Sequence, residues 1–209
     1  GDGAFIGCHG LTHLTFPDGL TTIGDGAFIG CHELTHLTFP ATARLTSIGN
    51  NAFDGCHGLT HLTFPKGLLV ICQGTFKNCT GLTSITFPDS LTSIGDGAFA
   101  GCTNLKCLIV PPSFVDEGTP YWQERGIDIH KTAIMTKEQL QNFKKTHHID
   151  ENTSISQIAT LYLAQQKLIP LPDPRADLSE KKFHPITQLT LQNLLKLNID
   201  RSLILSGLK

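Results

Sequence analysis

Histidine and cysteine recur at constant spacing through the first part of the chain. A histidine directly follows a cysteine three times, and another histidine comes four residues later each time: Cys8-His9 and His13, Cys31-His32 and His36, Cys56-His57 and His61. A cysteine beside a histidine is the pair that a thiol nucleophile uses, and three grouped imidazoles can hold a metal. Closely spaced imidazoles also resist joint protonation, which is the basis of a pH switch. The elements that carry these side chains decide between these chemistries.

These histidines belong to a repeat over residues 1–111. Four segments are near-copies of one another: GDGAFIGCHGLTHLTFP (1–17), GDGAFIGCHELTHLTFP (24–40), GNNAFDGCHGLTHLTFP (49–65) and GDGAFAGCTNLKCLIVP (95–111). A fifth, CQGTFKNCTGLTSITFP (72–88), keeps the pattern with changes. Successive repeats are offset by 23, 25, 23 and 23 residues, and the longer offset comes from two extra residues within 41–44. This period lies in the range of leucine-rich repeats, whose coils must stack to bury their apolar sides.

Within one coil, apolar and polar residues alternate as in a short strand. Leu14 and Phe16 should point inward, Pro17 should end the strand, and Leu20 and Ile23 should form the opposite wall. The predicted fold is therefore an α/β repeat, a leucine-rich-repeat solenoid in which short parallel strands stack in a right-handed coil. A small α-helical C-terminal segment is expected to follow it.

The repeat resembles the BspA-type leucine-rich repeat, whose signature is approximately I-G-x-x-A-F-x-x-C-x-x-L-x-x-I-x-x-P. The resemblance covers residues 1–111 and recurs five times. This family occurs in surface and secreted proteins of microbes that live on or in host cells, and it is associated with adhesion and protein–protein contact. The resemblance therefore implies a protein partner.

The repeat pattern decays after Pro111. A short helix that begins at Thr119 and ends at Gly126, followed by a last strand over 127–129, is expected to close the open end of the stack. Phe114, Tyr121 and Trp122 are suited to cover that end. We therefore assign 112–130 to a C-terminal cap.

Residues 131–209 have a different character. Lys and Arg number four before residue 119 and twelve after it, against nine Asp and Glu on each side. Capping boxes at 136–139 and 154–157 predict two helices, and a proline-broken linker is expected over 168–174. Further helices are predicted near 189–197 and from 200 to about 207. This part is expected to be a helical segment.

The outward strand positions are the leading candidate site. They form two columns along the stack: His13 and Thr15, His36 and Thr38, His61 and Thr63, and Ser84 and Thr86, followed by Cys107 and Ile109. With strands about 4.8 Å apart, three imidazoles would stack beside a row of threonines. We predict a flat, uncharged, hydrogen-bonding surface for a protein partner. Metal capture, a pH switch, or a repeated residue without function are the alternatives, and a flat row offers poor tetrahedral geometry for a metal.

The column of cysteines is expected to be structural. Cβ atoms joined by a disulfide face one another at about 3.8 Å, whereas stacked equivalents point the same way. Five cysteines should therefore be small buried hydrophobic residues with free thiols: Cys8, Cys31, Cys56, Cys79 and Cys102. Each neighbouring histidine should turn outward on a loop, so that no catalytic pair forms. No cofactor motif is present in the sequence.

Composition narrows the functional classes. A net charge of −2 argues against a nucleic-acid binder, and no apolar run reaches the roughly 20 residues of a membrane span. There is no signal peptide, but the chain begins within a repeat, so we expect a preceding segment. We predict a non-enzymatic interaction module, a secreted microbial effector delivered into host cytosol, where free thiols persist, with a host protein as partner. The alternatives are a microbial surface adhesin, or an enzyme with activity in 131–209, a part without a cysteine nucleophile.

Overall fold

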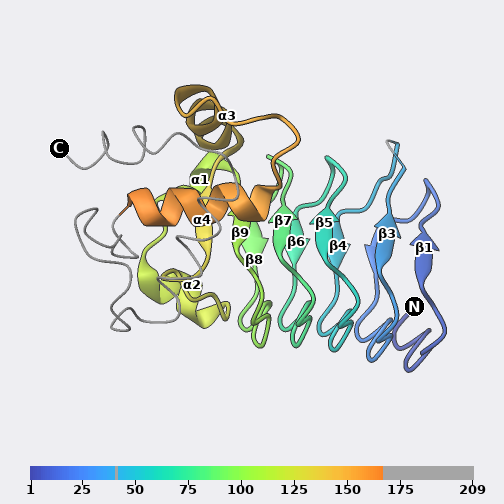
Figure 1. The fold of residues 1–209 in the computed structure, drawn as a ribbon. Helices are drawn as coiled ribbons and strands as arrows, with labels where there is room; N and C mark the ends of the chain where they lie inside the picture. Colours follow the sequence, from blue (N-terminus) through green and yellow to red (C-terminus); the bar gives the residue numbers. More distant parts are fainter. Residues whose placement is uncertain (41, 167–209) are drawn as a thin grey trace. The chain divides into compact units, whose positions relative to one another are not determined.

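The structure, a computed structural model, describes residues 1–40 and 42–166. It divides after Lys137 into two compact units. The first unit is the stack of coils. Each of the first four repeats contributes one strand to each of two layers, and the fifth repeat contributes a strand to one layer only (Figure 1). The predicted solenoid is confirmed.

The front strands carry the outward histidine and threonine positions. They are β1 (His13–Thr15), β3 (His36–Thr38), β5 (His61–Thr63), β7 (Ser84–Thr86), β9 (Cys107–Ile109) and β10 (Ala133–Met135). The back strands are β2 (Thr22–Ile23), β4 (Ser47–Ile48), β6 (Val70–Ile71) and β8 (Ser93–Ile94), and they form one continuous sheet. Paired strands are in register, so equivalent residues of successive repeats become neighbours.

Rows of aromatic rings fill the interior. Stacked rings with centroid distances of 5.1, 5.1, 5.4 and 6.0 Å form one row: Phe5, Phe28, Phe53, Phe76 and Phe99. Phe5 is exposed, whereas its four equivalents are buried, because it belongs to the first coil. Ring stacking and burial along this row hold the coils at a constant pitch.

The cap replaces the next coil at the end of the stack. Helices α1 (Pro112–Val115) and α2 (Thr119–Glu124) follow the last repeat, and Trp122 and Phe114 are buried, as predicted. Helix α2 begins at Thr119 itself, after the N-cap Gly118. The Phe99 N–H donates to the carbonyl of Arg125 at 2.9 Å. The equivalent N–H of each earlier repeat donates to a carbonyl of the following coil. The end of α2 therefore supplies the acceptor that a further repeat would have supplied.

The last strand lies later than the sequence predicts. The segment 127–129 is not a strand, because the Asp128 carbonyl accepts the N–H groups of Lys131 and Thr132 and closes a turn. Ala133–Met135 forms β10 instead and pairs in parallel with β9. The sheet thus continues into the range where the helical segment was expected to begin.

The second unit contains two described helices. These are α3 (Lys137–Thr146), which begins one residue before the division, and α4 (Ile155–Gln165). The predicted capping box at Ser154 is confirmed, since Gln157 N–H donates to Ser154 Oγ at 3.3 Å and Ser154 N–H donates to Gln157 Oε1 at 3.1 Å. Phe143 packs edge-on against Tyr162 with centroids 5.5 Å apart.

Within residues 1–40 and 42–166, no helix is long and apolar enough to cross a bilayer. The linker predicted over 168–174 and the helices predicted near 189–197 and 200–207 lie outside the described residues.

Candidate partner-binding surface on the front strands

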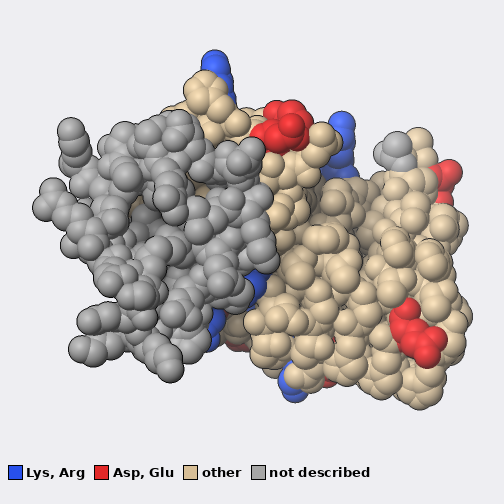
Figure 2. Space-filling model, in the orientation of Figure 1, with Lys and Arg blue, Asp and Glu red and all other residues tan. Residues whose placement is uncertain are grey.

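The outward side chains of β1, β3 and β5 are exposed, as predicted. His and Thr alternate there with an inward leucine on each strand: His13 and Thr15, His36 and Thr38, His61 and Thr63. Few Lys, Arg, Asp or Glu side chains appear on the visible side of the repeats (Figure 2). The exposed surface offers imidazoles and hydroxyls rather than charge.

The first two imidazoles are held parallel. His13 and His36 stack with centroids 4.6 Å apart and an interplanar angle of 2°. The Nδ1 atom of His13 lies 3.0 Å from Thr12 Oγ1, and that of His36 lies 2.8 Å from Thr35 Oγ1. The preceding threonine thus fixes each ring before any partner arrives.

The third imidazole does not continue this stack. His61 Nδ1 lies 2.8 Å from Ser84 Oγ, on the following strand. In the part of the chain that the structure describes, no backbone pairing joins β3 to β5, so the front strands form separate sheets of β1–β3 and β5–β7–β9–β10. The prediction of one column of three imidazoles is therefore wrong. The break falls at the 25-residue repeat, which has two more residues between Pro40 and Leu45 than the preceding repeat has between Pro17 and Leu20.

The outward positions become buried beyond β5. Ser84 is 4% exposed, Thr86 is half-buried, and Cys107 and Ile109 are buried, so a solvent-facing row is wrong for Ser84, Cys107 and Ile109. The chemistry of these positions changes with their burial, because Cys107 and Ile109 are apolar where earlier repeats have His and Thr. The accessible surface is centred on β1, β3 and β5.

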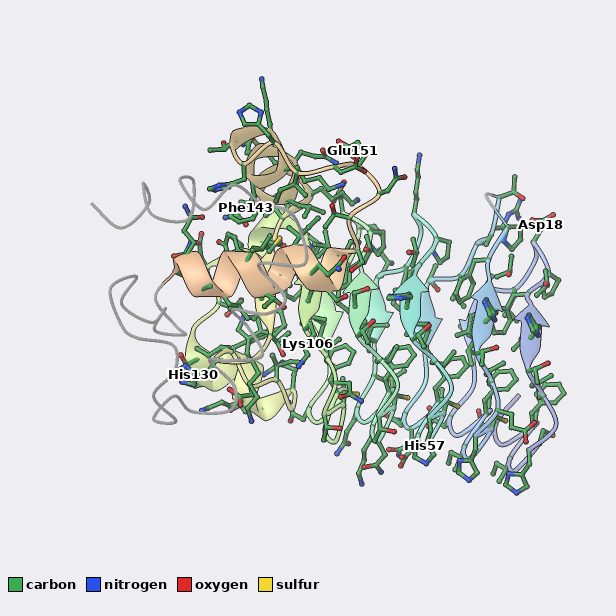
Figure 3. The ribbon with its side chains drawn as sticks, in the orientation of Figure 1. Asp18, His57, Lys106, His130, Phe143 and Glu151 are labelled. Carbon is green, nitrogen blue, oxygen red and sulfur yellow. The ribbon has the colours of Figure 1, made fainter. Side chains whose placement is uncertain are left out.

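A second row of histidines lies at the turns. His9, His32 and His57 stack with centroids 5.1 and 4.9 Å apart, and Figure 3 places His57 at the end of the coils opposite Asp18. Each Nδ1 donates to a carbonyl of the next coil, as His32 does to Gly55 at 2.8 Å and His57 to Asn78 at 2.9 Å. These imidazoles support the stacking of the turns.

The buried cysteines of the column bond to backbone carbonyls rather than to the neighbouring histidines. Cys31, Cys56 and Cys79 are buried, and the Sγ of Cys56 donates to the carbonyl of Phe28 at 3.2 Å. Burial raises the pKa of Cys56 to about 12, and a protonated thiol is a poor nucleophile. The neighbouring histidines are exposed and bond to the backbone, as expected. All seven cysteines are free, but Cys8, expected to be buried, is exposed because it belongs to the first coil.

Metal capture by the strand histidines has no support in the geometry. Across residues 1–40 and 42–166, no three His, Cys, Asp or Glu side chains are placed to share a metal ion. His36 and His61 lie on strands that do not pair, which separates the three imidazoles proposed for such a site.

Comparison with known proteins identifies the repeat. The sequence model described as BspA type leucine-rich repeat region matches residues 1–120 in six copies. The chain belongs to the BspA-type leucine-rich repeat family. Proteins with such repeats are protein-interaction or surface-type modules and form a non-enzymatic class. No curated protein matches the sequence.

Solved structures of bacterial leucine-rich repeat proteins have a similar fold. The leucine-rich repeat protein TpLRR of T. pallidum is 28% identical with a TM-score of 0.54, over 65% of this chain and 60% of that one. A leucine-rich repeat protein from Bacteroides ovatus is 30% identical with a TM-score of 0.54, over 64% of this chain and 32% of that one. The chain thus spans less than two thirds of either relative.

Proposed function

We propose that this protein is an interaction module that binds a protein partner through the exposed side chains of β1, β3 and β5. The observation that carries the proposal is the fixed arrangement of His13 and His36, whose rings stack with centroids 4.6 Å apart. Side chains that are ordered before binding lose little conformational entropy on association. Imidazoles and hydroxyls offer hydrogen bonds to a partner surface of low charge.

The other predicted contact residues differ in their exposure to solvent. His36, Thr38, His61 and Thr63 are exposed and contact the partner directly, and half-buried Thr86 lies at the margin of the surface. Ser84 is buried and acts by holding the His61 ring at 2.8 Å. The contact area is therefore smaller than the sequence predicts and lies nearer the N-terminal coils.

We place this activity in a secreted microbial protein with a host protein as partner. Seven free cysteines support delivery into a reducing host cytosol, where thiols persist. A surface adhesin is the second candidate, because BspA-type repeats are surface-type modules. A partner recovered from host cytosol favours the first candidate, and one recovered only from intact host cell surfaces favours the second.

The surface is tested by affinity capture from host cell lysate. His36→Glu with Thr38→Glu places two carboxylates on the proposed surface, and it should remove the partners that the unchanged protein retains. The matched control is Thr22→Glu with Ser93→Glu, at exposed positions of the back strands. Equal recovery of every partner by both variants, with unchanged circular dichroism, would count against the front strands as the contact surface.

A further inference from the structure

The front strands are interrupted between β3 and β5, whereas the back strands continue past the same point. β2, β4, β6 and β8 form one sheet, and Phe28 and Phe53 stack across the junction at 5.1 Å. Paired front strands bring most of their Cα atoms within 8 Å of one another, but β3 and β5 do not. The two halves of the front sheet are thus joined behind and open in front.

The aromatic row behind the front strands changes at the same junction. Phe16 stacks on Phe39 at 4.9 Å and 12°, and Phe64 stacks on Phe87 at 5.6 Å and 8°. Between these pairs, Phe39 and Phe64 are tilted by 46° at 6.0 Å. The interruption therefore extends from the outward histidines into the apolar layer beneath them.

Two strand edges face this opening with unused backbone groups. In a parallel ladder, alternate residues direct their N–H and C=O groups to opposite neighbours. Thr38 accepts the Phe16 N–H at 3.0 Å, toward β1, so Leu37 is directed toward β5. His61 and Thr63 are likewise directed toward β3. Among the described residues, no backbone hydrogen bond links Leu37 to His61 or Thr63.

The floor of the opening is apolar and partly accessible. Leu37 and Phe39 are only half-buried, although their equivalents Leu62 and Phe64 are buried. The His36 ring is stacked on His13 through one face, and the described residues place no ring against its other face. An inserted strand would thus contact Leu37 and Leu62 beneath it and the free face of the His36 ring beside it.

We infer that an extended segment of the protein partner inserts between β3 and β5 as a parallel strand. This inference rests on the proposed function and specifies how the partner is bound. Only an extended backbone can form hydrogen bonds with both edges together. Its N–H and C=O groups would bond alternately to the backbone of Leu37 on one side and to the backbones of His61 and Thr63 on the other. With about 4.8 Å between neighbouring strands, insertion sets β3 and β5 about 9.6 Å apart.

The neighbouring side chains define the chemistry of the inserted segment. An aliphatic residue enters between Leu37 and Leu62. The residue before it stacks on the His36 ring and is aromatic or histidine, and the residue after it lies between Thr38 and Thr63 and is Thr or Ser. The outward positions of β3 and β5 are His and Thr, with no Lys, Arg, Asp or Glu among them, so the segment needs no charged residue there.

The probe is a fluorescein-labelled synthetic peptide, LTHLTFP, which has the sequence of residues 11–17 and the required His-Leu-Thr order. Saturable binding by fluorescence anisotropy is expected, together with slowed exchange of the Leu37, His61 and Thr63 amides by NMR. N-methylation of the leucine that follows the histidine removes the N–H directed to His61 and should weaken binding about tenfold. Absence of saturable binding, or protection of other amides only, would overturn the inference.

Matched variants test the two edges. Thr63→Pro removes the N–H that faces the opening, whereas Thr63→Val keeps it and the branched shape. We expect Thr63→Pro to bind the peptide about tenfold more weakly than Thr63→Val. Equal affinities would show that this edge does not bind the peptide.

Closing the opening separates this inference from the proposed function. Deletion of Ala41 and Thr42 gives the turn after β3 the length of its neighbours, and it should pair β3 with β5 and abolish peptide binding. It leaves His36, Thr38, His61 and Thr63 exposed. If this variant still captures the partner that His36→Glu with Thr38→Glu loses, the surface functions without insertion and the inference fails. If the glutamate variant retains the partner, the proposed function fails instead.

Discussion

The Sγ of Cys56 donates to the carbonyl oxygen of Phe28, 3.2 Å away in the preceding coil. The same contact joins Cys31 to Phe5, Cys79 to Phe53 and Cys102 to Phe76 at 3.1–3.2 Å. Four thiols of the cysteine column thus fill space and also give a second donor to a carbonyl that already accepts a backbone N–H. This relationship explains why thiols occupy these positions without a disulfide.

Removal of one such thiol should destabilise the stack. Cys56→Ala leaves a small cavity and removes one of the two donors to the Phe28 carbonyl, which keeps the Cys31 N–H, so we expect a loss of about 1 kcal/mol in the free energy of unfolding, measured by urea denaturation. Cys8→Ala is the control, because Cys8 is exposed and its loss should cost less than about 0.5 kcal/mol. Equal effects at both positions would contradict a structural role for the buried thiol.

Thiol accessibility should follow burial. Cys8 should react with a thiol reagent in the native protein, whereas Cys31, Cys56, Cys79 and Cys107 should react only after denaturation. Titration with and without guanidinium, followed by peptide mass mapping, identifies each site. Rapid native labelling of Cys56 would show that the coils do not stack as described.

Alkaline pH should weaken the fold. Burial raises the pKa of Cys56, Cys102 and Cys107 from 9.0 to about 12, so their thiols ionise in the unfolded chain before they ionise in the folded one. Their contribution to stability is complete below pH 9 and is lost as the pH rises from 9 toward 12. Urea denaturation at pH 7.5 and 10 should show a smaller loss for Cys56→Ala than for the unchanged protein. The same loss in both proteins would mean that other groups account for it.

The junction between the repeats and the cap depends on Gly126. Its φ of 82° lies in the left-handed region, and a Cβ atom there would lie 2.5 Å from the backbone nitrogen of Ala100. Gly126→Ala should therefore destabilise the protein by about 2 kcal/mol or more. Gly118→Ala is the control, since its φ is −72° and its nearest neighbour would be Pro120 Cδ at 3.6 Å. The measurement is the midpoint of thermal unfolding of both variants. An unchanged midpoint for Gly126→Ala would contradict the close approach of Gly126 to the Ala100 backbone.

The second unit offers a local test. Ser154→Ala removes the side-chain acceptor of the capping box that begins α4 and should cost about 1 kcal/mol. Ser154→Asp keeps an acceptor and should retain most of the stability. Faster amide exchange at Gln157 in Ser154→Ala, but not in Ser154→Asp, is the expected readout. Unchanged exchange in both variants would show that the box contributes little.

The sequence by itself determined the coils and their contents. Because the repeats have nearly constant length, Phe28, Phe53 and Phe76 had to fall into one row, and each cysteine had to occupy the same place in its coil. The N-cap role of Ser154 and the burial of Trp122 were also predictable, because capping boxes and solenoid ends have local residue requirements.

Only the tertiary structure decided where the front surface is continuous. From the sequence alone, two extra residues after Pro40 could have changed the turn and nothing else. In the structure they coincide with the separation of β3 from β5, and strand pairing depends on how one coil stacks on the next. Likewise, Ala133–Met135 is too short to identify as a strand without its partner β9. Burial of Ser84 also depends on distant contacts, which the local pattern of alternating residues does not specify.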